Sequence, residues 1–153
     1  MDSKEQKITV RNMTIDDYDR VYALWLDCAG MGLNNIDDSR NGIEKFLTRN
    51  PDTCYVAADR EKIVGVILSG NDGRRGYIYH TAVAPEYRHT GIGRRLVEAA
   101  LQSLKEQGII KVCLVAFERN KAGNAFWESL GFAKRTDLAY RDHTLIQMVR
   151  IDT

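Results

Sequence analysis

The chain has 153 residues and a hydrophobic share of 44%, which suits a single core, so we expect one domain over residues 1–153. Its formal net charge of +1 at pH 7 argues against a nucleic-acid or anionic-membrane partner, because both attract clustered Lys and Arg. No apolar run approaches the ~20 residues of a membrane span, and the first residues lack the apolar core of a signal peptide. The three cysteines include no close pair, so we expect reduced thiols in a cytoplasmic protein.

Apolar periodicity predicts a strand, two helices and a hairpin in the first half of the chain. The alternating residues at 8–11 predict a short strand, and Thr14 is expected to cap the helix that follows. A second helix is expected to begin near Ser39. A charged turn between two apolar runs predicts a hairpin of strands at 54–58 and 63–69.

The second half is expected to alternate between strands and helices. An apolar stripe at Leu96, Ala100 and Leu104 predicts a helix that ends at Gly108. The other expected elements are strand 77–83, strand 109–117, helix 120–130 and strands 132–140 and 144–151. The full order is β-α-α-β-β-β-α-β-α-β-β, which predicts the α/β class (α+β, a central mixed sheet with helices on both faces).

One motif in this sequence predicts a phosphate site. The strand before it ends at Pro85, and Arg88-x-x-Gly91-x-Gly93 leads directly into an amphipathic run. The first turn of a helix presents N–H groups without partners and a partial positive charge, so it attracts phosphate. Glycine lacks Cβ, which lets the backbone turn and its amides approach an anion closely.

This motif resembles the acetyl-CoA signature of the GNAT family of N-acetyltransferases, Gln/Arg-x-x-Gly-x-Gly/Ala, at every fixed position. The segment 120–132, Asn-Lys-Ala-Gly-Asn-Ala-Phe-Trp-Glu-Ser-Leu-Gly-Phe, resembles the second motif of the family. The stretch 70–88 is similar to bacterial members related to ribosomal-protein N-terminal acetyltransferases. The resemblance covers nearly the whole chain. It implies the GNAT fold, acetyl-CoA as co-substrate, and direct attack of a primary amine on the thioester without a metal.

The resemblance also implies a set of residues that bind acetyl-CoA. The pyrophosphate lies on the glycine motif and the first turn of its helix, with the charge of Arg88 nearby. The pantetheine arm pairs with the strand backbone where the strands of Val83 and Val115 separate. Asn120 hydrogen-bonds the arm, caps the last helix or does both, and Trp127 packs along the arm. The residues implied to bind the cofactor are Ala82, Val83, Arg88, His89, Thr90, Gly91, Ile92, Gly93, Arg94, Asn120 and Trp127.

Acetyl transfer needs a neutral amine. At neutral pH an ordinary lysine amine is only ~0.1% neutral, whereas roughly tens of per cent of an α-amine are neutral. Many relatives carry a glutamate base where this chain has Val115, so we expect an α-amine or another amine of low pKa as the acceptor. The candidate bases are Glu118, alternatively a solvated loop residue, and His80, alternatively a structural histidine. Strand alternation predicts that only one of Tyr79 and His80 faces the cleft.

The candidate acid and the acceptor site follow from the same resemblance. Relatives protonate the departing thiolate with a tyrosine at the position of Trp127, and an indole cannot supply a proton usefully. Tyr140 or a water molecule is therefore the candidate acid. The acceptor is expected near 30–38, where Asp37 and Asp38 either attract a cationic amine or stabilise a helix N-terminus.

Two other functions remain open. A non-catalytic acyl-CoA-binding regulator would explain why the usual acid and base are replaced at Trp127 and Val115. An enzyme that acetylates aminoacyl-tRNA is disfavoured by the near-neutral charge. The sequence does not choose between a protein or peptide N-terminus and a small-molecule amine as acceptor, and it leaves a homodimer open.

Overall fold

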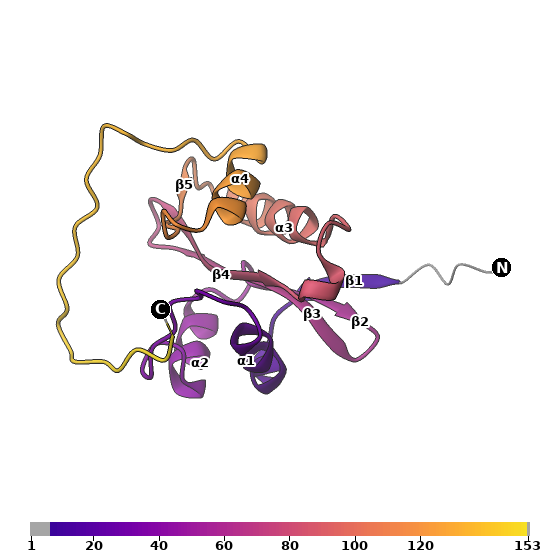
Figure 1. Ribbon diagram of the computed structural model, residues 1–153. Coiled ribbons are helices and arrows are strands. Elements are labelled where there is room, and N and C mark those ends of the chain that lie inside the picture. Colours follow the sequence, from indigo (N-terminus) through magenta and orange to yellow (C-terminus); the bar gives the residue numbers. More distant parts are fainter. Residues whose placement is uncertain (1–6, 153) are drawn as a thin grey trace.

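A mixed sheet with the strand order β1-β2-β3-β4-β5 forms the centre of the computed structural model, which describes residues 7–152 (Figure 1). Strands β1 to β4 pair antiparallel, and β5 pairs parallel to β4. The strands are β1 (Ile8–Asn12), β2 (Tyr55–Asp59), β3 (Lys62–Asn71), β4 (Gly76–Val83) and β5 (Val112–Cys113). Neighbours in the chain are therefore neighbours in the sheet, as short connections favour.

Helices cover both faces of this sheet, which confirms the predicted fold class. Figure 1 shows α1 and α2 on one face and α3 and α4 on the other. The helical segments are η1 (Ile15–Asp17), α1 (Tyr18–Leu26), α2 (Arg40–Arg49), η2 (Pro85–Tyr87), α3 (Ile92–Glu106) and α4 (Lys121–Ser129), where η marks a short 3-10 helix. No helix within residues 7–152 has both the length and the hydropathy to cross a membrane.

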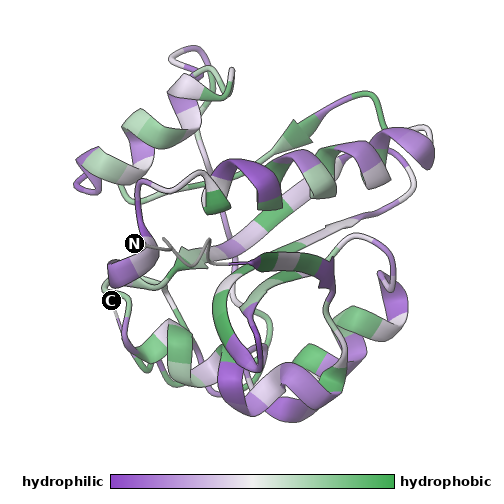
Figure 2. Ribbon diagram, turned by 90° about the vertical axis from the view of Figure 1, so that its right-hand side faces the viewer, coloured by the Kyte–Doolittle hydropathy of each residue, from purple (hydrophilic) through white to green (hydrophobic). Residues whose placement is uncertain are grey.

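The core lies on both sides of β3, which is buried along nearly its whole length between β2 and β4. Trp25 of α1 is fully buried against one face of the sheet. The predicted stripe of Leu96, Ala100 and Leu104 is fully buried under α3, and Figure 2 shows apolar and polar residues alternating around this longest helix. The second predicted helix begins as expected, because the Ser39 hydroxyl accepts a hydrogen bond from the Gly42 N–H (3.0 Å).

The predicted strands after α3 are largely wrong. The strand expected over 109–117 is reduced to β5, and the strands expected at 132–140 and 144–151 do not form. An alternating apolar pattern favours a strand only where a sheet edge is available for pairing, and β5 pairs with β4 through just two residue pairs.

The C-terminal segment 133–149 is instead an exposed chain that runs around one side of the molecule (Figure 1). Leu145 in this segment is 87% exposed. The chain returns to the body at Arg150, which forms an isolated bridge with Asn34, and the Ile151 N–H donates to the Leu33 carbonyl (2.9 Å).

Candidate functional site

One edge of β4 is open near its end. The pairing of β4 with β5 stops after Tyr77 and Cys113, so within residues 7–152 no strand pairs with 78–83 on that side. The Ala84 N–H donates to β3, to the Val64 carbonyl (2.8 Å). Because backbone groups alternate along a strand, the groups of Val83 point to the open edge, while Ala82 lies opposite Val66 of β3. The resemblance implied a gap between the strands of Val83 and Val115, but Val115 lies beyond the end of β5, so β4 is open here because its neighbour has ended.

The loop after η2 leads into α3, whose first turn leaves the amides of residues 92–94 without an acceptor in the described chain. His89 has φ of 63° and Gly91 has φ of 87°, both in the left-handed region. The first helical bond runs from the Arg95 N–H to the Gly91 carbonyl (3.1 Å), and within residues 7–152 no group accepts from the N–H of residues 92–94. The Thr90 hydroxyl turns away and donates to the Tyr87 carbonyl. Unpaired amides at a helix start are the kind of group that binds an anion, so we refer to the backbone of residues 89–94 as the cradle.

The two glycines of the motif are required for different structural reasons. Gly91 needs its left-handed backbone, and nothing lies within 4 Å of the place where a Cβ would be. A Cβ on Gly93 would lie 3.1 Å from Cζ of Phe126 on α4. Gly93 therefore allows α3 and α4 to pack closely, whereas the sequence interpretation assigned its missing Cβ to an approaching phosphate.

The arginines of this region lie in three different settings. The Arg88 guanidinium donates through Nε to the Val83 carbonyl (3.1 Å), so it sits at the open edge of β4. Arg94 is exposed and lies 3.8 Å from a Glu98 carboxylate oxygen one turn further along α3. Arg95 donates to the Ile8 carbonyl of β1 (3.2 Å). Arg88 precedes the free amides in the chain and Arg94 belongs to the first turn of α3, so both provide positive charge in this region.

The residues predicted on α4 have well-defined partners. The Asn120 side chain accepts from the Gly123 N–H (2.9 Å), so its alternative role as the helix cap is confirmed. The Trp127 ring is half-buried and lies edge-on to Phe126 (centroids 5.1 Å apart) and to Phe132 (5.2 Å). Trp127 thus belongs to an aromatic cluster that borders the core.

A β-bulge redirects His80. The register between β3 and β4 shifts between Val66 and Leu68, and His80 has φ of 37°. As a result both candidates on this strand face the helices α1 and α2, because Tyr79 contacts Phe46 and His80 contacts Trp25. The expectation that only one of them faces this side is wrong, since a bulge interrupts the alternation.

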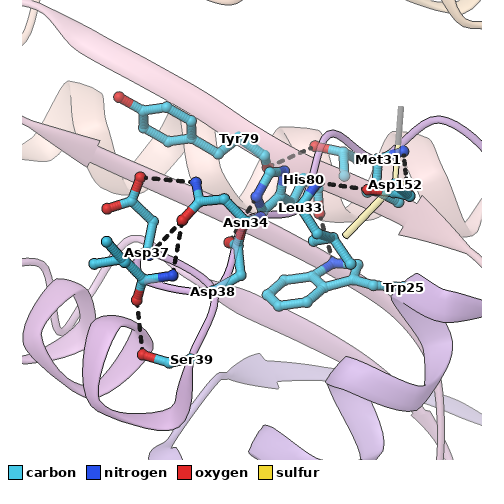
Figure 3. Close-up of polar contacts among 12 residues, drawn as sticks. Trp25, Met31, Leu33, Asn34, Asp37, Asp38, Ser39, Tyr79, His80 and Asp152 are labelled. Atoms are coloured by element: carbon cyan, nitrogen blue, oxygen red, sulfur yellow. Dashed lines mark hydrogen bonds and ion pairs between the residues drawn. The ribbon is translucent and has the colours of Figure 1, made fainter. Parts of the chain in front are cut away.

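His80 forms a largely buried hydrogen-bonded contact with a carboxylate that the sequence did not reveal. Its Nε2 lies 2.7 Å from Oδ1 of Asp38, and the two side chains are 16% and 3% exposed (Figure 3). The other carboxylate oxygen of Asp38 accepts from the Asn34 N–H (2.8 Å). The indole N–H of Trp25 donates to the His80 carbonyl (3.1 Å). In the sequence, Asp38 is a candidate through its place in the expected acceptor segment 30–38 and next to the helix cap, and neither position gives information about a histidine 42 residues away.

The other two candidate catalytic residues are exposed. The Glu118 side chain is 87% exposed, and its hydrogen bond with Lys134 (2.8 Å) lowers the pKa of the carboxyl, which makes it a weaker base. Tyr140 lies in segment 133–149 and is 68% exposed. Within residues 7–152 neither side chain is hydrogen-bonded to β4, and no group of three or more His, Cys, Asp or Glu is arranged to hold a metal ion.

Known proteins resemble this chain in sequence and fold. The family described as the Acetyltransferase (GNAT) family matches residues 18–132. An acetyltransferase of Photorhabdus laumondii subsp. laumondii is 35% identical over 126 residues, which are 82% of this chain and 87% of the relative. The PaiA N-acetyltransferase of Thermoplasma acidophilum, solved with coenzyme A, has a TM-score of 0.73 at 19% identity, over 83% of this chain and 90% of that one. The ribosomal-protein-S18-alanine N-acetyltransferase of Escherichia coli has a TM-score of 0.68 at 20% identity, over 85% of this chain and 80% of that one.

Proposed function

The chain belongs to the acetyltransferase (GNAT) family, and on that premise we propose that it transfers the acetyl group of acetyl-CoA to a primary amine. In this reaction the neutral amine nitrogen attacks the thioester carbonyl carbon. The C–S bond breaks, coenzyme A leaves as the thiolate, and the amine gives up one proton. The observation that carries the proposal is the row of free amides at the start of α3, which lies next to the open edge of β4.

Two parts of the site are proposed to hold the cofactor. The pyrophosphate would accept hydrogen bonds from the amides of 89–94, with Arg88 and Arg94 supplying charge. The pantetheine arm would pair with the Val83 backbone at the open edge, next to Ala82, in the manner of an added strand, and would replace the Arg88 guanidinium on the Val83 carbonyl. Asn120 and Trp127 of α4 are proposed to contact the arm. The solved relative that contains coenzyme A supports acetyl-CoA as co-substrate.

We propose His80 as the general base. Of the three candidate catalytic residues, His80 is the one that is largely buried. Its partners Asp38 and Trp25 lie on the face of the sheet that α1 and α2 cover. A base at a fixed position typically contributes about 10²–10⁴ in rate. Glu118 and Tyr140 are left as weaker candidates because both are exposed.

The proposed acceptor is an α-amine or another amine of low pKa. Val115, at the position of the usual carboxylate, is 57% exposed and offers no base. An α-amine is about a hundredfold more often neutral than a lysine amine at neutral pH, so it depends less on deprotonation. The solved acetyltransferase that acts on the alanine of ribosomal protein S18 supports a protein N-terminus as one such acceptor.

We also propose that residues 1–153 form one domain and that the protein is located in the cytoplasm.

An acetylation screen tests this function. The purified chain and acetyl-CoA are incubated with peptides bearing a free α-amine, with the same peptides blocked at the α-amine but carrying lysine, and with polyamines, aminoglycosides and amino acids. We expect release of free coenzyme A thiol with the unblocked peptides. Efficient reaction of the blocked lysine peptides alone would reject the acceptor class, and coenzyme A binding without turnover on any amine would favour the acyl-CoA-binding regulator.

A further inference from the structure

We propose that Asp38 is the positioning residue of His80: its carboxylate fixes the imidazole in the tautomer that leaves Nδ1 free to accept the proton of the attacking amine. This inference rests on the proposed acetyl transfer and extends it to a residue outside the family motifs. Its first consequence, the tautomer, is measurable without any acceptor.

The hydrogen bond between the two side chains determines the tautomer. An ionised carboxylate only accepts hydrogen bonds, so the Nε2 that lies 2.7 Å from Asp38 must carry the proton. Nδ1 of the neutral imidazole then keeps its lone pair. No group in the described part of the chain is hydrogen-bonded to Nδ1. Residues 7–152 contain no fully buried polar side-chain atom without a partner, so Nδ1 is not completely enclosed. Nδ1 is therefore the atom of His80 that we propose accepts the proton of the substrate amine.

The Asp38 carboxylate is held on a well-ordered turn. Its second oxygen accepts from the Asn34 N–H (2.8 Å), and its backbone carbonyl accepts from the Tyr18 hydroxyl (2.6 Å). The Asn34 side chain in turn accepts from the N–H groups of Ile36 (2.9 Å) and Asp37 (2.8 Å) (Figure 3). The carboxylate is thus fixed in place before any substrate binds.

In the described chain, the imidazole of His80 is the only group within 4 Å that can pair with the charge of Asp38, and it does so as a cation once it has taken up a proton. A buried carboxylate is costly unless it is paired, so it stabilises the imidazolium that forms when His80 takes a proton. The same division of labour, with a carboxylate that orients and an imidazole that transfers, operates in the Ser-His-Asp triad.

Helix α1 and the bulge hold the imidazole from the other side. The Trp25 indole donates to the His80 carbonyl (3.1 Å), and its ring lies edge-on to the imidazole with centroids 5.2 Å apart. A left-handed backbone is unfavourable for a histidine and persists only where neighbouring contacts stabilise it. Here the unfavourable backbone turns the side chain toward Asp38.

The substitution Asp38→Asn gives a defined expectation. The Asn34 N–H would continue to donate to the oxygen of the new side-chain amide at position 38. The NH₂ group of that amide would then face Nε2 of His80. Nε2 would then have to accept, and the proton would move to Nδ1. We expect a fall in kcat of about 10²-fold or more, with the KM for acetyl-CoA unchanged.

The experiment combines ¹⁵N NMR of labelled histidine with steady-state kinetics. The chain has three histidines, and the His80→Gln spectrum assigns the signals of His80. We expect the Nε2–H tautomer in the wild-type protein and the Nδ1–H tautomer in Asp38→Asn. The matched control is Asp17→Asn, which removes another buried carboxylate (2% exposed) that binds Arg11 rather than His80. This control should leave the tautomer and kcat unchanged.

Several results would overturn the proposal. An Nδ1–H tautomer in the wild-type protein refutes it without any variant, as does a folded Asp38→Asn protein with unchanged kcat. If Asp38→Asn had a lower kcat but an unchanged tautomer, Asp38 would have a structural role only. In a double-mutant cycle, Asp38→Asn should cost nothing further in the His80→Gln background, and an equal loss in both backgrounds would also refute it. If no amine is acetylated at all, the proposed function fails while the tautomer result still decides the Asp38–His80 contact.

Discussion

The titratable side chains on the two sides of the open edge of β4 differ in their exposure and in their partners. On the side of α1 and α2, His80 and Asp38 lie in a buried contact. On the side of β5 and segment 133–149, Glu118 and Tyr140 are exposed, and Glu118 pairs only with the exposed Lys134. All three catalytic candidates have chemically suitable side chains. The difference shows that the partners around a residue, more than its type, decide whether its side chain is held in one position.

The largest effect on kcat should come from a substitution on the buried side, at His80. Replacing His80 with glutamine removes the proposed proton acceptor, and we expect kcat to fall by about 10²–10⁴-fold with little change in coenzyme A affinity. Steady-state kinetics with the acceptor found in the screen, together with calorimetry for coenzyme A, measures both quantities. A kcat within about twofold of the wild-type value would show that His80 is a structural histidine.

The second prediction concerns stability on the same side. Burial raises the pKa of Asp17, but hydrogen bonds from Arg11 and from the Thr14 N–H outweigh it, so the net pKa lies below the ordinary value of 3.8. This stabilisation is therefore complete above about pH 4 and is lost as the pH falls through the folded-state pKa. We expect Asp17→Asn to lower the free energy of unfolding by about 1–3 kcal/mol at pH 7 and by less near pH 2–3. Urea denaturation at both pH values measures this, and an equal loss at both would contradict it.

A substitution in the cradle separates cofactor binding from proton transfer. A β-branched residue is strained at the φ of 87° of Gly91, so Gly91→Val should distort the free amides. We expect a loss of coenzyme A affinity of at least about tenfold, which is ~1.4 kcal/mol. Gly73 has the same φ and equally open surroundings in the turn before β4, so Gly73→Val is the matched control. Calorimetry that finds the same affinity in both folded variants would reject the cradle as the pyrophosphate site.

The smallest effects are expected on the exposed side. Glu118→Gln removes an exposed ion pair with Lys134, and Tyr140→Phe removes an exposed hydroxyl. Exposed pairs of this kind contribute little, so each variant should stay within about twofold of the wild-type kcat. A tenfold loss in either one would mean that the exposed side orders on substrate binding and takes part in the reaction.

The sequence by itself determined the local features of this protein. The motif from Arg88 to Gly93, the Ser39 cap and the apolar stripe of α3 each depend on residues within a few positions of one another, and the structure shows the free amides of the motif, the cap and the buried stripe. The matches of 120–132 and of the glycine motif to the GNAT family were also visible in the sequence, and the family is confirmed.

Only the tertiary structure decided which side chains meet and which strands exist. The contact of His80 with Asp38 joins residues 42 positions apart, and it depends on a bulge that breaks the alternation on which the sequence prediction relied. Gly93 is explained by Phe126 on another helix. The strands predicted at 132–140 and 144–151 have suitable alternation, yet β5 provides no long edge for them. A strand is stabilised by hydrogen bonds to a neighbour, so its formation depends on a partner that its own sequence does not specify.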